Sequence, residues 1–316
     1  MKPQRSLIVT GLAVSIVFAS ASHGAEALQK IRVGLPSVAL TYMPFYVAQE
    51  KGFLKKAGIE AEYIQMNTAI QPQALINGNI NFFPSLSTGI SAAVAGLPLV
   101  AVLNFYTVNP WMLVTSKAIN KPADLLGKKI AISGIRNTGH YLLMAWFKKV
   151  EINDKEISFV MTGGTAGSYS TLATNQVAGA VLTPPYDDKA VSIGFKKFVM
   201  IGDLIDTPTS GLVTSRAEIA NNRERVQKTI AACLDAIGWI RANRADSVKM
   251  ISEKFKITPA EANGTYDTFI GMLNPDGRVA PKILRGYMEV LRQERSVPAD
   301  IDVQKFVDFS MLPAGK

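Results

Sequence analysis

The chain has 316 residues, 48% of them apolar, which is enough for a sizeable core and for two lobes. Its net charge of +9 comes from scattered lysines and arginines without a run of five or six like charges, so the sequence gives no nucleic-acid signature. Cys233 is the only cysteine, which excludes an intrachain disulfide.

The first residues have the pattern of a secretory signal peptide. Lys2 and Arg5 precede a mostly apolar run at residues 7–19, and small residues follow. This run is shorter than the roughly 20 residues that a membrane-spanning helix needs. We therefore expect residues 1–27 to be a signal peptide that is cleaved at about residues 21–27. We expect the mature chain to lie in the periplasm without a lipid anchor, because no cysteine is near the cleavage site.

Strands and helices alternate through the first hundred or so residues. Short apolar runs that end at proline, glycine or polar residues predict strands. Apolar residues at helical spacing that end near glycine predict helices. Strands that alternate regularly with helices along the chain indicate a mostly parallel sheet. The expected strands are 31–35, 60–66, 80–84 and 99–105, and the expected helices are 44–56, 71–76 and 88–95.

The same alternation then starts again, and the last third of the chain is helical. In that last third, Val226, Ile230 and Leu234 recur at helical spacing, and Thr258 with Glu261 forms a capping box. We therefore expect a second α/β unit at 112–205. Its expected strands are 111–115, 129–133, 157–161, 179–182 and 198–201, and its expected helices are 122–127, 139–149 and 168–175.

The order of these elements predicts an α/β fold of two lobes. Lobe 1 is expected to combine 28–111 with 206–316, and lobe 2 to be inserted between them as 112–205. Open α/β sheets bind ligands at the carboxyl ends of their strands, so two facing lobes would form a closable cleft. Two connecting strands would serve as the hinge.

The sequence lacks the usual catalytic constellations. It has no phosphate-binding loop, no dinucleotide fingerprint and no nucleophile elbow. His140 is the only histidine outside the signal region, and Cys233 lies in a helical stripe. One histidine and one cysteine cannot supply a metal cluster or a Cys–His pair. We therefore expect no enzyme, no metal and no cofactor.

Small polar residues recur between the end of a strand and the start of a helix. The positive end of a helix, with its unpaired N–H groups, favours an anion or a polar oxygen there. Each turn alone could be ordinary N-capping, but together they predict a ligand site. Arg136 is the one basic residue in these turns and could hold a carboxylate or sulfonate, or could simply be exposed. The candidate ligand-binding residues are Thr41, Tyr42, Ser85, Ser87, Thr88, Trp111, Arg136, Asn137, Thr138, Gly139, Tyr169 and Tyr186.

Three segments in this order and spacing resemble a known family. They are Pro44 to Gly58 followed by a strand from Ile59, Lys121 to Ile130, and Leu182 to Tyr186. They are similar to the periplasmic substrate-binding proteins of ABC transporters, in the group that serves nitrate, sulfonates, taurine and thiamine-pyrimidine precursors. The resemblance implies a type II-like two-lobe fold with a two-strand hinge. It also implies a monomer without catalysis, a small-molecule ligand, and a permease partner in the inner membrane.

Several functions remain open at this point. A small organic anion of the sulfonate or carboxylate type is the leading ligand, and a pyrimidine-like or other neutral heteroaromatic is the alternative. A pyrimidine synthase shares the same fold, but the Cys-rich motif of the yeast-type enzymes is absent here and an export signal would be out of place. An extracellular sensor module would usually carry a membrane helix and a signalling domain in the same chain.

Overall fold

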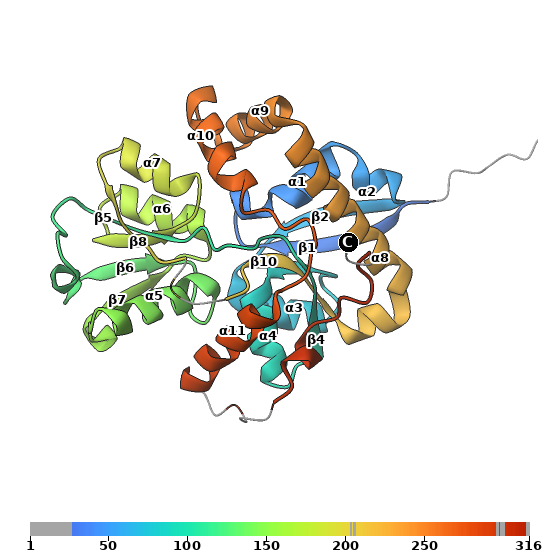
Figure 1. Ribbon diagram of the computed structural model, residues 1–316, viewed down its shortest axis with the longest axis horizontal. Coiled ribbons are helices and arrows are strands. Elements are labelled where there is room, and N and C mark those ends of the chain that lie inside the picture. Colours follow the sequence, from blue (N-terminus) through green and yellow to red (C-terminus); the bar gives the residue numbers. More distant parts are fainter. Residues whose placement is uncertain (1–26, 203, 205–206, 295–296, 298–300, 314–316) are drawn as a thin grey trace, which may run out of the picture.

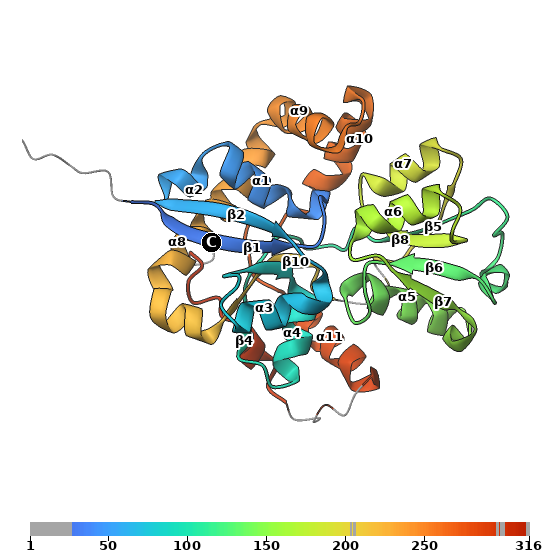
Figure 2. The same cartoon turned by 180° about the vertical axis from the view of Figure 1, so that it is seen from behind.

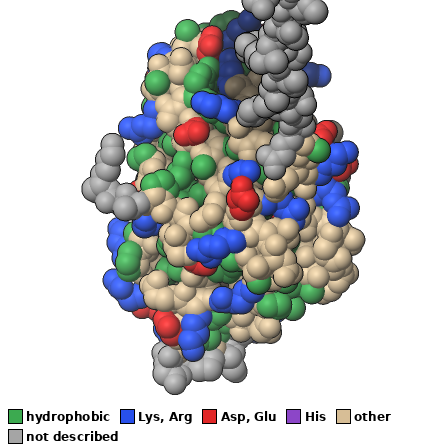
Figure 3. All heavy atoms as spheres, turned by 90° about the vertical axis from the view of Figure 1, so that its right-hand side faces the viewer, with side chains coloured by type: hydrophobic (Ala, Val, Ile, Leu, Met, Phe, Trp, Pro, Cys, Tyr) green, Lys and Arg blue, Asp and Glu red, His purple; other side chains and the backbone are tan. Residues whose placement is uncertain are grey.

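The structure is a computed structural model that describes residues 27–202, 204, 207–294, 297 and 301–313. The expected signal peptide, apart from its last residue Ala27, lies outside the described residues. The chain forms two α/β lobes joined by two crossing segments (Figure 1). On the face shown in Figure 3, lysines and arginines lie scattered among acidic and neutral side chains rather than in one patch. Within the described part, no helix combines the length and apolar character needed to cross a membrane.

The smaller lobe is built on one sheet with the strand order β7-β6-β8-β5-β9. Strands β6, β7 and β8 are parallel, and β5 is antiparallel to both of its neighbours. Helices α6 and α7 cover one face and α5 covers the other (Figures 1 and 2). The strands are β5 Met112–Thr115, β6 Lys129–Ile132, β7 Ser158–Met161, β8 Gly179–Leu182 and β9 Lys196–Met200, and the helices are α5 Thr138–Lys149, α6 Thr165–Ala173 and α7 Tyr186–Ser192.

Alternation along these strands divides the core of the smaller lobe into two halves. Successive side chains of a strand point to opposite faces of the sheet. Leu113 and Ile130 therefore pack with the aromatic side chains of α5, Trp146 and Phe147. The neighbouring residues Met112, Val114 and Ala131 pack on the opposite face with Leu172 of α6 and Ala190 of α7.

The larger lobe repeats the same arrangement with segments from both ends of the chain. β1 and β2 pair in parallel, and a parallel bridge joins Val33 of β1 to Phe82, the residue directly before β3. β10 lies antiparallel between β3 and β4. The strands are β1 Gln29–Leu35, β2 Ile59–Gln65, β3 Phe83–Ser85, β4 Leu99–Asn104 and β10 Ser210–Ser215.

Helices cover both faces of the larger sheet. Side chains of α1, α8, α9 and α10 share one apolar cluster with β1, and those of α3, α4 and α11 share a second cluster with Phe83. Cys233 is fully buried in the first cluster, within α8. The helices are α1 Met43–Glu50, α2 Phe53–Lys56, α3 Gln71–Ile76, α4 Leu86–Val94, α8 Arg216–Ala242, α9 Arg244–Phe255, α10 Pro259–Ile270 and α11 Pro281–Glu294. Short 3₁₀ helices are Leu40–Tyr42, Thr68–Ile70, Pro122–Leu125, Asp154–Glu156 and Val303–Phe306.

The structure changes some of the expected element boundaries. The helix expected over 44–56 is broken into α1 and α2, because Gly52 adopts a left-handed conformation with φ of 76°. The strand expected over 80–84 is shorter and begins at Phe83. The capping box of Thr258 and Glu261 is confirmed at the start of α10.

Two segments cross between the lobes. One runs from Phe105 to Trp111, and the described residues of the other are Ile201, Gly202, Leu204 and 207–209. The two segments are bound to each other, because the Asn109 side-chain amide donates to the backbone oxygen of Thr207 at 2.8 Å and to its hydroxyl at 3.2 Å. A Cβ on Gly202 would come within 1.8 Å of the Asn109 oxygen, so only glycine allows this close approach. The two crossings therefore form one paired connection.

Candidate functional site

A cavity lies between the two lobes and takes its walls from both. With its solvent-open mouth included, it has a volume of about 460 Å³. The larger lobe and the crossing segments contribute Pro36, Ala39, Thr41, Tyr42, Thr68, Ser85, Ser87, Trp111, Thr209 and Ser210. The smaller lobe contributes Ser133, Asn137, Thr138, Gly164, Thr165 and Thr183.

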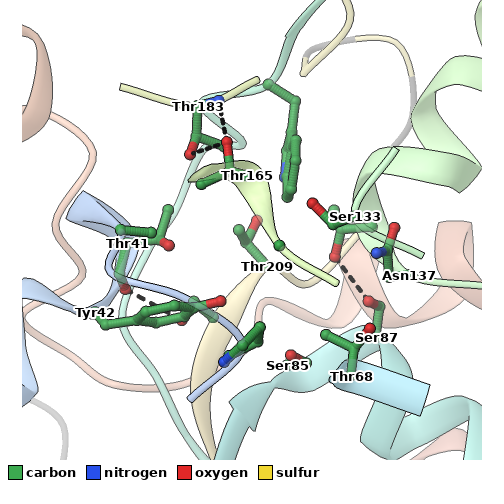
Figure 4. A pocket seen from close by; sticks show the side chains of 16 residues that line it. Thr41, Tyr42, Thr68, Ser85, Ser87, Ser133, Asn137, Thr165, Thr183 and Thr209 are labelled. Atoms are coloured by element: carbon green, nitrogen blue, oxygen red, sulfur yellow. Dashed lines mark hydrogen bonds between the residues drawn. The ribbon is translucent and has the colours of Figure 1, made fainter. Parts of the chain in front are cut away.

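Most of these residues follow the carboxyl end of a strand, which explains why they meet. Pro36 follows β1, Ser133 follows β6 and Thr183 follows β8. The carboxyl ends of parallel strands share one edge of a sheet, where α/β proteins bind ligands. The two sheets turn these edges towards each other, so the polar turns of both lobes converge (Figure 4).

Among the described residues, the N-cap residues of four helices, α1, α4, α5 and α6, line the cavity, and only α5 has a side-chain cap. At α5, the Asn137 side chain accepts a hydrogen bond from the backbone N–H of His140 at 3.0 Å. At α4 and α6, the N-cap residues Ser85 and Gly164 make no such bond. The first N–H groups of a helix and its positive dipole end favour an acceptor or an anion.

The cavity wall is rich in hydroxyl groups and poor in charge. Among the described residues that line it, none carries a charged side chain. One pair of these hydroxyls bonds across the lobes, Ser87 with Thr138 at 2.7 Å. The Thr165 hydroxyl accepts from the Thr183 backbone N–H at 3.2 Å (Figure 4). The wall therefore offers neutral donors and acceptors.

Two lining residues bury polar atoms that have no partner. The Ser133 hydroxyl and the Trp111 indole nitrogen Nε1 are both inaccessible, and neither has a hydrogen-bond partner among the described residues. Ser133 is 7% exposed. Buried polar groups in folded proteins are nearly always hydrogen-bonded, so each exception calls for an explanation.

Burial also fixes the protonation of the titratable groups near the cavity. Desolvation raises the pKa of the Tyr42 hydroxyl well above its ordinary value, so this side chain stays neutral. His140 lies in α5 with its ring edge-on to Phe159, and burial lowers its pKa to about 4. The cavity is therefore uncharged at neutral pH. The described residues also contain no group of three His, Cys, Asp or Glu side chains that could hold a metal ion.

The structure brings seven of the twelve candidate residues together. They are Thr41, Tyr42, Ser85, Ser87, Trp111, Asn137 and Thr138.

The other five lie outside the lining. Arg136 is exposed, and Gly139 lies against the ring of Trp111. Thr88 is in the first turn of α4 with a buried, unpartnered hydroxyl. Tyr169 and Tyr186 form a tilted ring pair with centroids 5.5 Å apart.

Nine lining residues were not among the candidates. Most share one signal, since seven of them lie within four residues after the end of a strand. Thr209 ends the second crossing and Ser210 begins β10, and no sequence pattern distinguishes them. The nine are Pro36, Ala39, Thr68, Ser133, Gly164, Thr165, Thr183, Thr209 and Ser210.

The lobes contact each other at separate places around the cavity. The Tyr186 hydroxyl of α7 donates to the backbone oxygen of Val38 at 2.9 Å, and the Lys189 ammonium donates to the backbone oxygen of Phe255. Elsewhere, the rings of Tyr141 and Tyr287 pack edge to face at 5.4 Å. These contacts close the lobes over the cavity.

Two α/β lobes around such a cavity constitute the periplasmic binding-protein fold, as solved structures confirm. The alkanesulfonate-binding protein SsuA from Xanthomonas axonopodis pv. citri, bound to MOPS, superposes with a TM-score of 0.73 and 18% identity, over 88% of this chain and 97% of that one. The nitrate-binding protein NrtA from Synechocystis PCC 6803 superposes with a TM-score of 0.71 and 15% identity, over 90% and 87%. The chain belongs to the NMT1/THI5-like family, whose sequence model matches residues 40–247.

Two curated proteins are related in sequence. The riboflavin-binding protein RibY from Chloroflexus aurantiacus is 24% identical over 237 residues, which are 71% of this chain and 66% of that protein. The nitrate import ATP-binding protein NrtC from Synechocystis is 34% identical over 118 residues, which are 36% of this chain and 16% of that protein. The matches thus span just under two thirds of the first relative and a small part of the second.

Proposed function

We propose that this protein is the substrate-binding component of an ABC importer. It captures a small organic anion of the sulfonate or carboxylate type between its lobes and delivers it to a membrane permease. The observation that carries this proposal is the cavity closed by both lobes, with the N-termini of α1, α4, α5 and α6 at its wall. Relatives that bind alkanesulfonate and nitrate on the same fold support it.

A neutral wall is compatible with an anionic ligand. A buried anion is costly unless it is hydrogen-bonded, but it need not face a cation. At α4 the backbone N–H of Leu86 already donates to the Thr209 backbone oxygen at 3.2 Å. The next N–H groups of α4 and the first of α6, which no N-cap side chain bonds, can supply donors together with the surrounding hydroxyls. Hydrogen bonds to a charged acceptor are about twice as strong as neutral ones.

A neutral heteroaromatic ligand is the second candidate. The uncharged lining, with Trp111 and Tyr42 as aromatic walls, suits such a ring, and the riboflavin-binding relative supports it. We propose that neither ligand is transformed. The neighbours on this fold are binding proteins, and His140, the only histidine among the described residues, does not line the cavity.

We further propose that the mature protein is a periplasmic monomer. We also assign the hinge to the paired crossings, with lobe boundaries at about residues 112 and 205.

A thermal-shift screen tests the function. The purified mature protein would be mixed with ethanesulfonate, benzoate, nitrate, 4-aminopyrimidine and riboflavin. A ligand at one hundred times its Kd stabilises the folded state by about 2.7 kcal/mol, which raises the melting temperature. A shift with the first three would favour the anion, and one with the last two the heteroaromatic. No shift with any of them would contradict the proposal.

A further inference from the structure

Trp111 is both a wall of the cavity and a part of the connection between the lobes. It is the last residue of the first crossing, directly before β5. Its backbone oxygen accepts hydrogen bonds from the N–H groups of Ile201 and Gly202, at 3.0 and 3.2 Å, which belong to the second crossing. The backbone of Trp111 is therefore held in place by the paired crossings.

The ring of Trp111 is held as well. A Cβ built on Gly139 would come 2.9 Å from the ring carbon Cζ3, so the indole lies directly on the backbone at the start of α5. A donor fixed on both sides in this way loses little freedom on binding, which strengthens each hydrogen bond that it makes.

The fixed indole nevertheless leaves its polar atom unused. Nε1 is buried and has no hydrogen-bond partner within the described part of the chain. The hydroxyl of Ser133, which also lines the cavity, is likewise buried without a partner there. An indole N–H can donate but cannot accept. The group that satisfies it must therefore be an acceptor.

We propose that Trp111 is a specificity-determining residue whose Nε1–H donates a hydrogen bond to an acceptor atom of the ligand. This inference rests on the proposed binding function and narrows the ligand class. The part of the ligand that faces Trp111 carries an oxygen or ring nitrogen with a free lone pair. It is not an ammonium or amidinium group, which has only donors and would meet no carboxylate in this wall.

The test compares Trp111→Phe with Trp239→Phe by calorimetric titration. Trp111→Phe keeps an aromatic ring but removes the donor. Trp239→Phe is the matched control, because Trp239 packs in the α8 cluster and does not line the cavity. The probe is whichever of ethanesulfonate, benzoate, nitrate, 4-aminopyrimidine and riboflavin binds the wild type most tightly. Benzamidine, which has the shape of benzoate but only donors, is the counter-probe.

We expect a Kd about 10- to 100-fold higher for Trp111→Phe, a change within about twofold for Trp239→Phe, and no binding of benzamidine. Gly139→Ala keeps the donor but pushes the ring aside, and we expect it to weaken binding too. An unchanged Kd for Trp111→Phe, or benzamidine binding as tightly as benzoate, would overturn the inference alone. If the wild type bound none of the probes, both the proposed function and the inference about Trp111 would be contradicted.

Discussion

His140 is a buried, neutral side chain whose titration affects the stability of the fold. Desolvation is the largest cause of its pKa of about 4, while Asp154 raises that pKa and Arg136 lowers it to a smaller extent. In the unfolded chain a histidine titrates near 6.5. Between about pH 6.5 and 4 the unfolded state therefore binds more protons, so the free energy of unfolding decreases as the pH falls through this window.

We expect His140→Gln to remove this part of the pH dependence. Between about pH 7.5 and 5, His140 should account for about 2 kcal/mol of the stability that the wild type loses. Urea unfolding at several pH values gives the free energy of unfolding of both proteins. The difference between the two plots of this free energy against pH is the contribution of His140, because the carboxylates contribute equally to both. Parallel curves for the two proteins would mean that His140 is not buried as described.

Arg136 lies in the turn before α5, but its side chain is exposed and does not line the cavity. We therefore expect Arg136→Ala to change the Kd of an anionic probe such as ethanesulfonate by less than about twofold, since an exposed charge in water contributes little. Calorimetric titration measures this. A loss of about 2–5 kcal/mol, the cost of removing one partner of a buried charge pair, would show instead that Arg136 reaches the ligand.

The turn that opens α6 approaches the larger lobe closely. A Cβ on Gly164 would come 2.7 Å from the Cβ and Oγ of Ser37 in the loop after β1. The φ of Gly164 is −179°, which any residue adopts, so the close approach and not the backbone conformation requires glycine.

Gly164→Ala should therefore hinder closure without damaging either lobe. We expect probe affinity to fall about 5- to 150-fold, the usual range for overpacking, while the melting temperature without probe stays nearly unchanged. Titration and thermal unfolding measure the two effects. Gly238→Ala is the control, because a Cβ there, on the exposed side of α8, meets no atom within 4 Å. Equal affinity for Gly164→Ala and wild type would argue against this contact in the bound state.

The elements that could be predicted from sequence are those whose apolar residues recur with a clear helical or strand period. The residues of α3 agree with the expected helix, and β4 and β6 differ from the expected strands by one residue. The sequence does not predict β10 or α7. β10 is buried on both faces, so its residues do not alternate, and α7 is a short helix whose first turn carries Asp187 and Asp188. Asp187 is buried there beside the Lys197 ammonium at 2.9 Å, a pairing that a linear pattern cannot reveal.

The candidate site was predictable to a similar extent. Turns that follow strands and precede helices yielded Ser85 and Asn137, and the same rule would have found Ser133 and Thr165. The charge of Arg136 makes it a candidate by sequence, but its φ of 61° lies in the left-handed region, and its side chain is exposed outside the cavity. Side-chain direction depends on backbone conformation, which residue type alone does not specify.

The two lobes should move as bodies about the paired crossings. The contact of Tyr186 with Val38 joins the two lobes in this structure, and we expect it to be lost on opening. A ligand can shift the equilibrium only through contacts that the closed form adds. We expect the radius of gyration from small-angle scattering to be smaller with a saturating probe than without it. The same radius in both conditions would count against the hinge.

The central position of β10 has a consequence for how the chain assembles. All five strands of the smaller lobe lie in one continuous stretch, whereas β10 must insert between β3 and β4, and Val213 pairs with Phe83 across the whole intervening lobe. Pairings between distant segments form slowly. During synthesis, the edges of β3 and β4 that pair with β10 therefore stay unpaired until the ribosome has made the smaller lobe and then β10. Such edges are templates for pairing with other chains, so this interval is when the protein is most exposed to aggregation.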